Sequence, residues 1–297
     1  MSGMKGITVF NFDHSLTAQY EFLQRFHARL NVISMLPFRR SVRLWSSERN
    51  FKKASKLMRL ETGRQFSLLG SGDYHHLTMA LLEQHQSPLT LVLFDNHPDW
   101  MRPPHKYHCG NWVYTAARLP QIERIVIIGL ENGDLVGKRF LAGDVESYLL
   151  KKIVLLPYLP IEVQLQNHQE SVHLESMLKI DLQAGIQEIL DTVTTDNVYV
   201  SVDKDCLRQL DAITNWEQGT LPLDTVTSCI KAIAESHNIV GADTVGDYSP
   251  PTFTSPLKWI GSMLDRPADA WRMNRQQQAN AVNALANFKL AEALGFV

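Results

Sequence analysis

The segment FDNHPDW, residues 94–100, places three side chains that bind metals well at alternate positions: Asp95, His97 and Asp99. It follows directly on the apolar run LTLVLF. Two carboxylates this close repel each other, and neither gains free energy from lying beside an apolar core. Either a cation neutralises them, or the segment is only a polar loop.

A second carboxylate pair follows another apolar run, VYVSV. In VYVSVDKDC, Asp203 and Asp205 are two positions apart, so an extended backbone puts both carboxylates on one side. A lone pair of this kind after a strand is more often a helix cap or a turn than a metal site. The repetition of the pattern after two separate runs instead favours a shared site.

A third polar segment, SGDYHHLT, follows the apolar run FSLLG and offers Asp73, His75 and His76 just before a predicted helix. In an open parallel sheet, ligands bind beyond the carboxyl ends of the strands. Because all three polar segments directly follow apolar runs, we expect them to meet at one edge of a sheet.

Carboxylates that converge without cations would have strongly raised pKa values or would destabilise the fold. Two divalent metal ions would neutralise four of them. Oxygen ligands with some imidazole suit Mn²⁺, with Fe²⁺, Co²⁺, Ni²⁺ and Zn²⁺ as alternatives. A structural zinc site is disfavoured because no cysteine lies among the proposed ligands. Two metals roughly 3.5–4 Å apart can lower the pKa of a shared water and present it to an electrophilic carbon.

Seven apolar runs of strand length alternate with helix-like stretches: GITVF, FSLLG, LTLVLFD, RIVIIGL, KIVLLPY, VYVSVD and NIVGAD. The stretches between them carry apolar residues at three- and four-residue steps: HLTMALLEQH, GNWVYTAARL, LESMLKIDLQAGIQEILDTV and LDTVTSCIKAIAESH. This alternation favours a three-layer α-β-α fold, in which helices cover both faces of a mostly parallel sheet. No linker or repeat divides the chain, so we expect one domain over residues 1–297. The tail NRQQQANAVNALANFKLAEALG predicts a closing helix that ends near Gly295.

The composition excludes several function classes. A net charge of −2 gives no electrostatic footprint for nucleic acid. The most basic stretch, PFRRSVRLWSSERNFKKASKLMR, is interpreted as the solvated face of one or two helices. Three scattered cysteines without CxxC spacing indicate a reducing, cytoplasmic compartment. We see neither a membrane span nor a signal peptide, and so expect no membrane partner.

These segments resemble the motifs of the arginase and agmatinase (ureohydrolase) superfamily, whose fold is shared by histone-deacetylase-type enzymes. FDNHPDW resembles its D-x-H-x-D motif and SVDKDC its S-x-D-x-D motif. GSGDYHHLT is similar to its G-G-D-H-S motif, and GADTVGDYSP to its G-x-D-x-x-E-x-N-P segment. The order along the chain agrees. SVDKDC followed by TNWEQG resembles a divergent arginase-like subgroup of unassigned function. The resemblance implies an arginase/deacetylase-like α/β fold.

The resemblance also implies six metal ligands: His75, Asp95, His97, Asp99, Asp203 and Asp205. In such a site Asp95 and Asp203 would bridge two metals. His75 is preferred because it keeps the following residues in register with the motif, and His76 is the alternative. His108, in YHCGNW, falls where ureohydrolases keep a histidine that transfers protons. Asp247 falls where they keep a glutamate that pairs with the substrate guanidinium. The alternative interpretations are that His108 is a histidine of a surface loop and that Asp247 is an aspartate that caps a turn or helix.

The predicted function is hydrolysis of a C–N bond in a guanidino, amidino or amide substrate, with a metal-bridging hydroxide as the nucleophile. The expected partner is a small-molecule substrate, and homo-oligomerisation stays open. One alternative is a binding protein of the same fold that is stabilised by metals but catalytically silent. A phosphoesterase ranks last, because few basic residues lie near the motifs: Arg102, Lys106, Lys204 and Arg208. Trp216, in TNWEQG, is either a buried aromatic residue or one wall of a substrate pocket.

Overall fold

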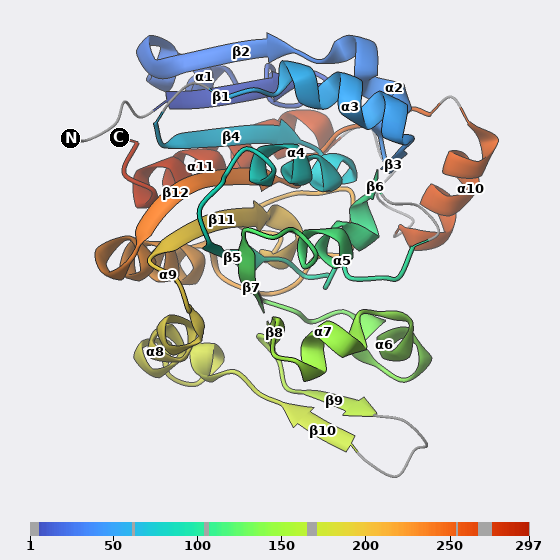
Figure 1. Cartoon of the computed structure of the whole chain (residues 1–297). Helices are drawn as coiled ribbons and strands as arrows, with labels where there is room; N and C mark the ends of the chain where they lie inside the picture. The colour runs from blue at the N-terminus through green and yellow to red at the C-terminus, as the bar shows by residue number, and fades with distance from the viewer. Residues whose placement is uncertain are drawn as a thin grey trace.

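The computed structural model describes residues 6–60, 63–103, 107–164, 171–253, 255–266 and 275–296. An eight-stranded sheet with the order β2-β1-β4-β12-β11-β5-β7-β8 forms its centre, and every neighbouring pair is parallel. The strands are β1 Gly6–Asn11, β2 Leu30–Ser34, β4 Gln65–Gly70, β5 Leu89–Phe94, β7 Ile122–Ile128, β8 Ile153–Leu156, β11 Asn197–Asp203 and β12 Asn238–Val245. Their carboxyl ends therefore lie along one edge of the sheet, at the arrowheads in Figure 1.

Helices cover both faces of the sheet (Figure 1). One layer consists of α1 Tyr20–Phe26, α8 Leu182–Thr192, α9 Leu223–Ser236 and α11 Gln276–Ala293. The opposite layer consists of α2 Arg39–Val42, α3 Glu48–Leu57, α4 Thr78–Leu82, α5 Trp112–Ala116, α6 Lys138–Ala142 and α7 Val145–Leu149. A further helix, α10 Pro256–Asp265, follows β12 along the chain. The architecture is the predicted three-layer α/β fold.

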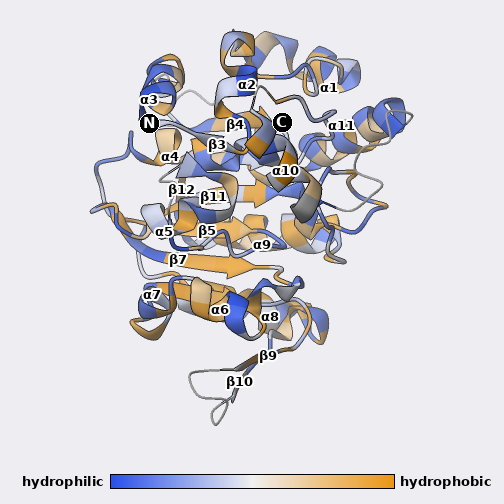
Figure 2. Ribbon diagram, turned by 90° about the vertical axis from the view of Figure 1, so that its right-hand side faces the viewer, coloured by the Kyte–Doolittle hydropathy of each residue, from blue (hydrophilic) through white to orange (hydrophobic). Residues whose placement is uncertain are grey.

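Alternate side chains of the strands pack into two separate hydrophobic cores, one on each face of the sheet. In β5, Val92 and Phe94 join the core under α9 and α11, whereas Leu91 and Leu93 join the core under α3, α4 and α5. Because both faces are covered, the strands read as continuous apolar runs rather than as alternating patterns. Figure 2 shows strand β7 in hydrophobic colours between helices that carry more hydrophilic residues.

All seven predicted runs form strands of this sheet, and the predicted helices correspond to α4, α5, α8, α9 and α11. The sequence prediction missed β2, an edge strand whose residues are half-buried or exposed and so show no continuous apolar run. It also missed two short antiparallel pairs: β3 Trp45–Ser46 with β6 Tyr107–His108, and β9 Ile161–Gln164 with β10 Ser171–Leu174. The single domain over residues 1–297 stays a prediction.

The basic stretch at residues 37–59 is only in part a solvated helical face. Arg43 is fully buried and its Nε donates to Asp73 Oδ2 at 2.5 Å, so the expectation of exposure is wrong for this residue. An arginine inside the protein is stable here because a carboxylate and backbone carbonyl oxygens accept its hydrogen bonds. Among the described residues, no helix combines the length and apolar composition that a membrane span requires.

A buried polar network joins the carboxyl ends of β11 and β12 to α11. Lys204 Nζ lies 3.0 Å from Asp247 Oδ2 and 2.9 Å from Asn287 Oδ1. The other carboxylate oxygen, Asp247 Oδ1, accepts from Gln19 Nε2 at 2.7 Å and from Asn287 Nδ2 at 3.3 Å. Lys204 and Asp247 are almost fully excluded from solvent, so each charge depends on the other for compensation.

We expect Lys204→Met to lower the free energy of unfolding by about 3–5 kcal/mol, because it leaves the Asp247 carboxylate buried and unpaired. The double variant Lys204→Met/Asp247→Asn removes both charges and should lose less than the sum of the two single variants. Denaturant titration of the metal-free proteins measures these changes without a contribution from metal binding. Single-variant losses below about 1 kcal/mol would show that the pair is not a structural element.

Candidate metal centre

Residues from three strand ends meet at one point of the sheet edge. His75 lies in the 3₁₀ helix Gly72–Leu77 that follows β4, Asp95 follows β5, and Asp203 is the last residue of β11. In the strand order, β12 lies between β4 and β11, and β5 lies beside β11. The parallel arrangement thus brings together segments that are far apart in the sequence, as the motif positions predicted.

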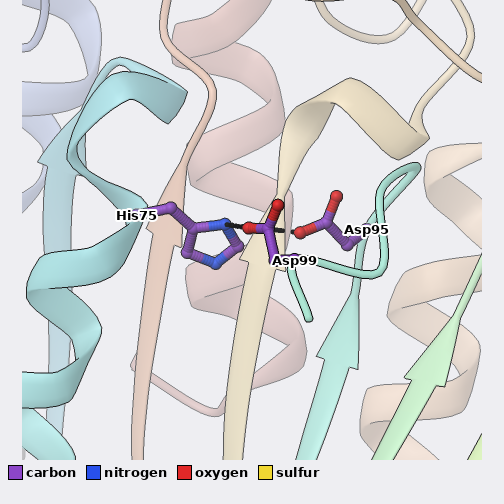
Figure 3. A group of neighbouring side chains, drawn as sticks. All are labelled: His75, Asp95 and Asp99. Atoms are coloured by element: carbon purple, nitrogen blue, oxygen red, sulfur yellow. Dashed lines mark ion pairs between the residues drawn. The ribbon is translucent and has the colours of Figure 1, made fainter. Parts of the chain in front are cut away.

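The imidazole of His75 lies at the centre of a first group. Its Nδ1 is 3.3 Å from Asp95 Oδ2, 3.2 Å from Asp99 Oδ2 and 3.4 Å from Asp203 Oδ2. Figure 3 shows the His75 ring pointing toward the Asp95 and Asp99 carboxylates. His75, Asp95 and Asp99 each offer one ligand atom within 4.8 Å of the others, which is compatible with a common ion.

A second group shares Asp95 with the first. His97 Nδ1 lies 3.0 Å from Asp205 Oδ2 and 3.8 Å from Asp95 Oδ1. Backbone hydrogen bonds fix these carboxylates, since His97 N donates to Asp95 Oδ1 at 2.7 Å and Asp205 N donates to Asp203 Oδ1 at 3.0 Å. The two groups thus form one cluster with Asp95 at the junction.

His75 rather than His76 faces the carboxylates. His76 is fully buried, and neither of its ring nitrogens has a hydrogen-bond partner in the structure. Burial lowers its pKa well below the usual value, so this imidazole is neutral. Neighbouring residues on a helical turn point about 100° apart, and therefore only one of the two rings can reach the cluster.

The cluster is short of positive charge. Burial, together with the Asp99 and Asp205 carboxylates, raises the pKa of Asp95 well above its usual value. Burial and the Asp205 carboxylate likewise raise the pKa of Asp203 to about 7. His75 Nδ1 lies within 3.4 Å of three carboxylate oxygens, one of them Asp95 Oδ2, yet neither His75 Nδ1 nor Asp95 Oδ2 has a partner with the geometry of a hydrogen bond. Orphaned ligand atoms beside crowded carboxylates fit divalent cations, which compensate both deficits.

Further polar contacts orient the cluster from outside. Trp112 Nε1 donates to Asp99 Oδ2 at 2.8 Å, and Ser201 Oγ lies 3.1 Å from His75 Nε2. Ser201 in turn donates to the buried Asp243 at 2.9 Å. The sequence analysis quoted Ser201 within the S-x-D-x-D motif but gave it no supporting role, although it precedes Asp203 by two positions and so shares its side of the strand. Contacts of this kind fix the tautomer and orientation of a metal-binding histidine.

A cavity of about 630 Å³ opens above the cluster. Its walls include Asp95, His97, Asp99, Asp203 and Asp205, together with His108 and Trp216. His108 Nδ1 accepts from Gly110 N at 2.9 Å, so the neutral imidazole carries its proton on Nε2. The ring stacks on Trp45, with centroids 5.7 Å apart, and the β3–β6 pairing places the two residues side by side.

Asp247 does not lie where the sequence predicted. Its carboxylate binds Lys204, Gln19 and Asn287, and it is absent from the cavity walls formed by the described residues. The expectation that it points into the same cavity as the metal ligands is therefore wrong. The physical reason is Lys204, whose ammonium group occupies the position beside Asp247 that a substrate cation would need.

The basic residues considered for phosphate binding are largely engaged elsewhere. Lys204 is buried against Asp247, and Arg208 pairs with Asp211 at 2.7 Å. Lys106 lies outside the described residues. Of the three described residues of this set, Arg102 alone lies on the cavity wall, which also carries Arg139. The arrangement therefore gives little support to a phosphoesterase.

No protein-family model matches the chain. An uncharacterized protein of Thermotoga maritima is 27% identical over 187 residues. The matched region covers 63% of this chain and 60% of that protein, so it spans less than two thirds of the relative's length.

Solved structures share the whole architecture at low sequence identity. The match with an agmatine ureohydrolase of Thermoplasma volcanium covers 99% of this chain and 90% of the ureohydrolase chain, with a TM-score of 0.60 and 14% identity. A Trypanosoma cruzi formiminoglutamase, solved with Mn²⁺, matches 98% of this chain and 94% of its own, with a TM-score of 0.57 and 14% identity. The chain therefore has the α/β fold found in arginases, agmatinases and formiminoglutamase.

Proposed function

We propose that the protein is a dinuclear-metal hydrolase that cleaves a C–N bond in a guanidino, amidino or amide substrate. The observation that carries the proposal is the position of Asp95, whose two carboxylate oxygens face two different histidines, His75 and His97. A residue shared in this way suits two adjacent cations. The structural neighbours, which include ureohydrolases, support the hydrolytic class of reaction.

Six residues would hold the two metals: His75, Asp95, His97, Asp99, Asp203 and Asp205. We propose Mn²⁺, because carboxylate oxygens outnumber imidazole nitrogens in this set. The ions, when bound, would polarise a carbonyl-type group and lower the pKa of a water. Asp95 and Asp203 would then keep their carboxylates deprotonated at neutral pH, since the cations offset the burial that raises their pKa values.

His108 is the residue best placed to move a proton. Because Gly110 N donates to Nδ1, the neutral ring carries its proton on Nε2. Once Nδ1 takes up a second proton, which ends the bond from Gly110 N, the imidazolium can give its Nε2 proton to the substrate and is left as a neutral ring. Stacking on Trp45 holds the plane of the imidazole. We assign His108 the transfer of a proton to the departing nitrogen, which otherwise leaves as an unstable anion.

The reaction would take place on a small molecule inside the cavity, in a reducing, cytoplasmic compartment. The three cysteines support that compartment, since all are buried and none forms a disulfide. A catalytically silent binding protein of the same fold differs only in turnover, so metal content and activity have to be measured separately.

We expect close to two divalent ions per chain after purification with Mn²⁺. Asp95→Ala and His75→Ala should each lower the metal content, because each removes a ligand from the cluster. His76→Ala is the matched control, and it should keep its metal while losing about 2 kcal/mol or more of stability through the cavity it creates. Elemental analysis and thermal unfolding measure the two quantities. Trace metal in a folded, Mn²⁺-supplemented sample would refute the dinuclear centre.

The Mn²⁺-loaded protein should release ammonia, urea or a carboxylic acid from at least one member of a panel of guanidino, amidino and acylated amines. On that substrate, His108→Ala should lower kcat on the order of 100-fold without changing the metal content, since general acid catalysis contributes at least that much. His173→Ala, an exposed histidine outside the cavity wall, is the control. A fully metallated protein that turns over no compound of the panel would favour the binding-protein alternative.

A further inference from the structure

Trp216 lies directly beside the proposed metal centre. The indole lines the cavity, and its ring centroid is 6.0 Å from that of His97. Gly72 shows how close the approach is, because a Cβ added there would lie 3.0 Å from Asp203 Oδ2 and 3.1 Å from Trp216 Cδ1. Because Gly72 has no side chain, the Trp216 indole and the Asp203 carboxylate can both pack against its backbone.

A buried ionic network fixes the orientation of the indole. Trp216 Nε1 lies 3.2 Å from Asp73 Oδ1 and donates to it. Asp73 is itself fully buried and binds the guanidinium groups of Arg43 and Arg266. Although burial alone would raise the pKa of Asp73, the two guanidinium groups hold it well below its usual range. The acceptor of the indole hydrogen bond is therefore a permanent anion.

One face of the indole is already occupied by a cation. Arg266 Cζ lies over the Trp216 ring, 4.8 Å from its centroid, and Arg266 is nearly excluded from solvent. The indole lines the cavity and Arg266 does not, among the described residues, so the part of the indole that faces the cavity is not the part that Arg266 covers. A ring binds cations through the negative potential of its faces. Arg266 draws on that potential, and its positive charge opposes a second cation on the open face.

Apart from the four carboxylates of the cluster, the described residues of the cavity wall include no buried carboxylate that could receive a cationic reacting group. Asp247 is closed off by Lys204, as described above. Asp134 accepts from Asn132 Nδ2 at 3.1 Å and lies 3.4 Å from Arg139. Glu217 also lines the cavity, but it is exposed to solvent, where an ion pair contributes little.

We propose that Trp216 is a specificity-determining residue whose open face stacks on an uncharged planar group, so that the substrate is a carboxamide-type compound rather than a protonated guanidine or amidine. This inference rests on the proposed function in that it takes the cavity above the metal centre as the substrate site. Of the substrate classes considered, it selects the amide.

Benzamide and benzamidine test the charge preference, because they have the same planar shape and differ at neutral pH by one positive charge. Isothermal titration of the Mn²⁺-loaded protein should show benzamide binding at least tenfold more tightly than benzamidine. Trp216→Leu should weaken benzamide binding at least tenfold without changing the metal content. Arg266→Gln should reduce the ratio of the two affinities at least threefold. Trp259→Leu, an aromatic residue outside the cavity wall, is the control and should change neither affinity.

If the wild-type protein binds benzamidine as tightly as benzamide or more tightly, the proposal is overturned. Loss of this benzamidine binding in Glu217→Gln would then identify the Glu217 carboxylate as the group that binds the cation. Unchanged benzamide affinity in Trp216→Leu would overturn it as well. If Arg266→Gln does not fold, the wild-type ratio and Trp216→Leu decide. These outcomes leave the dinuclear hydrolase intact, because that proposal is tested by metal content and turnover.

Discussion

Repulsion between buried carboxylates is the constraint on which the rest of the site depends. Asp95, Asp99, Asp203 and Asp205 converge at one edge of the sheet, and the imidazoles of His75 and His97 cannot compensate four negative charges. Like charges at this distance in a poorly hydrated place are costly unless cations lie between them. In the proposed dinuclear site the bound metals would relieve this repulsion, so metal binding would be coupled to folding.

The fold makes this crowding possible by distributing the ligands over three strand ends. Backbone N–H groups at the starts of the loops bind one oxygen of Asp95 and one of Asp203, which leaves the second oxygen of each turned toward His75. Close approach of the backbone is needed as well. A Cβ on Gly246, which has φ of +89°, would lie 2.6 Å from Asp203 Oδ1, so β12 can end beside β11 only with glycine there. The cluster is thus held by main-chain geometry, and at Gly246 that geometry requires glycine.

Seven of the eight strands of the sheet, and the segments that follow them, could be predicted from the sequence because buried parallel strands read as apolar runs and their carboxyl ends share one edge. The contacts of the residues around the cluster could not be predicted, because their partners lie in distant segments of the sequence and no local pattern identifies them. Arg43 was expected at the surface because it lies in a basic stretch, yet Asp73 binds it inside the protein. Asp247 matched a motif position, but no property of that position reveals that Lys204 would take its charge. The role of Trp216 likewise depends on Arg266, which lies far from it in the sequence and contacts it only in the folded structure.

Charge balance around the cavity connects the metal centre to the chemistry of the substrate. Two divalent ions would neutralise the four clustered carboxylates, so the loaded centre would not attract a cation through net charge. Lys204 and Asp247 compensate each other within the protein. Behind Trp216, the guanidinium groups of Arg43 and Arg266 share the Asp73 carboxylate, so that carboxylate is not available to a substrate cation. A neutral acyl group therefore meets no electrostatic penalty at the metal centre, whereas a guanidinium ion would need a carboxylate that this chain has already paired with its own lysine.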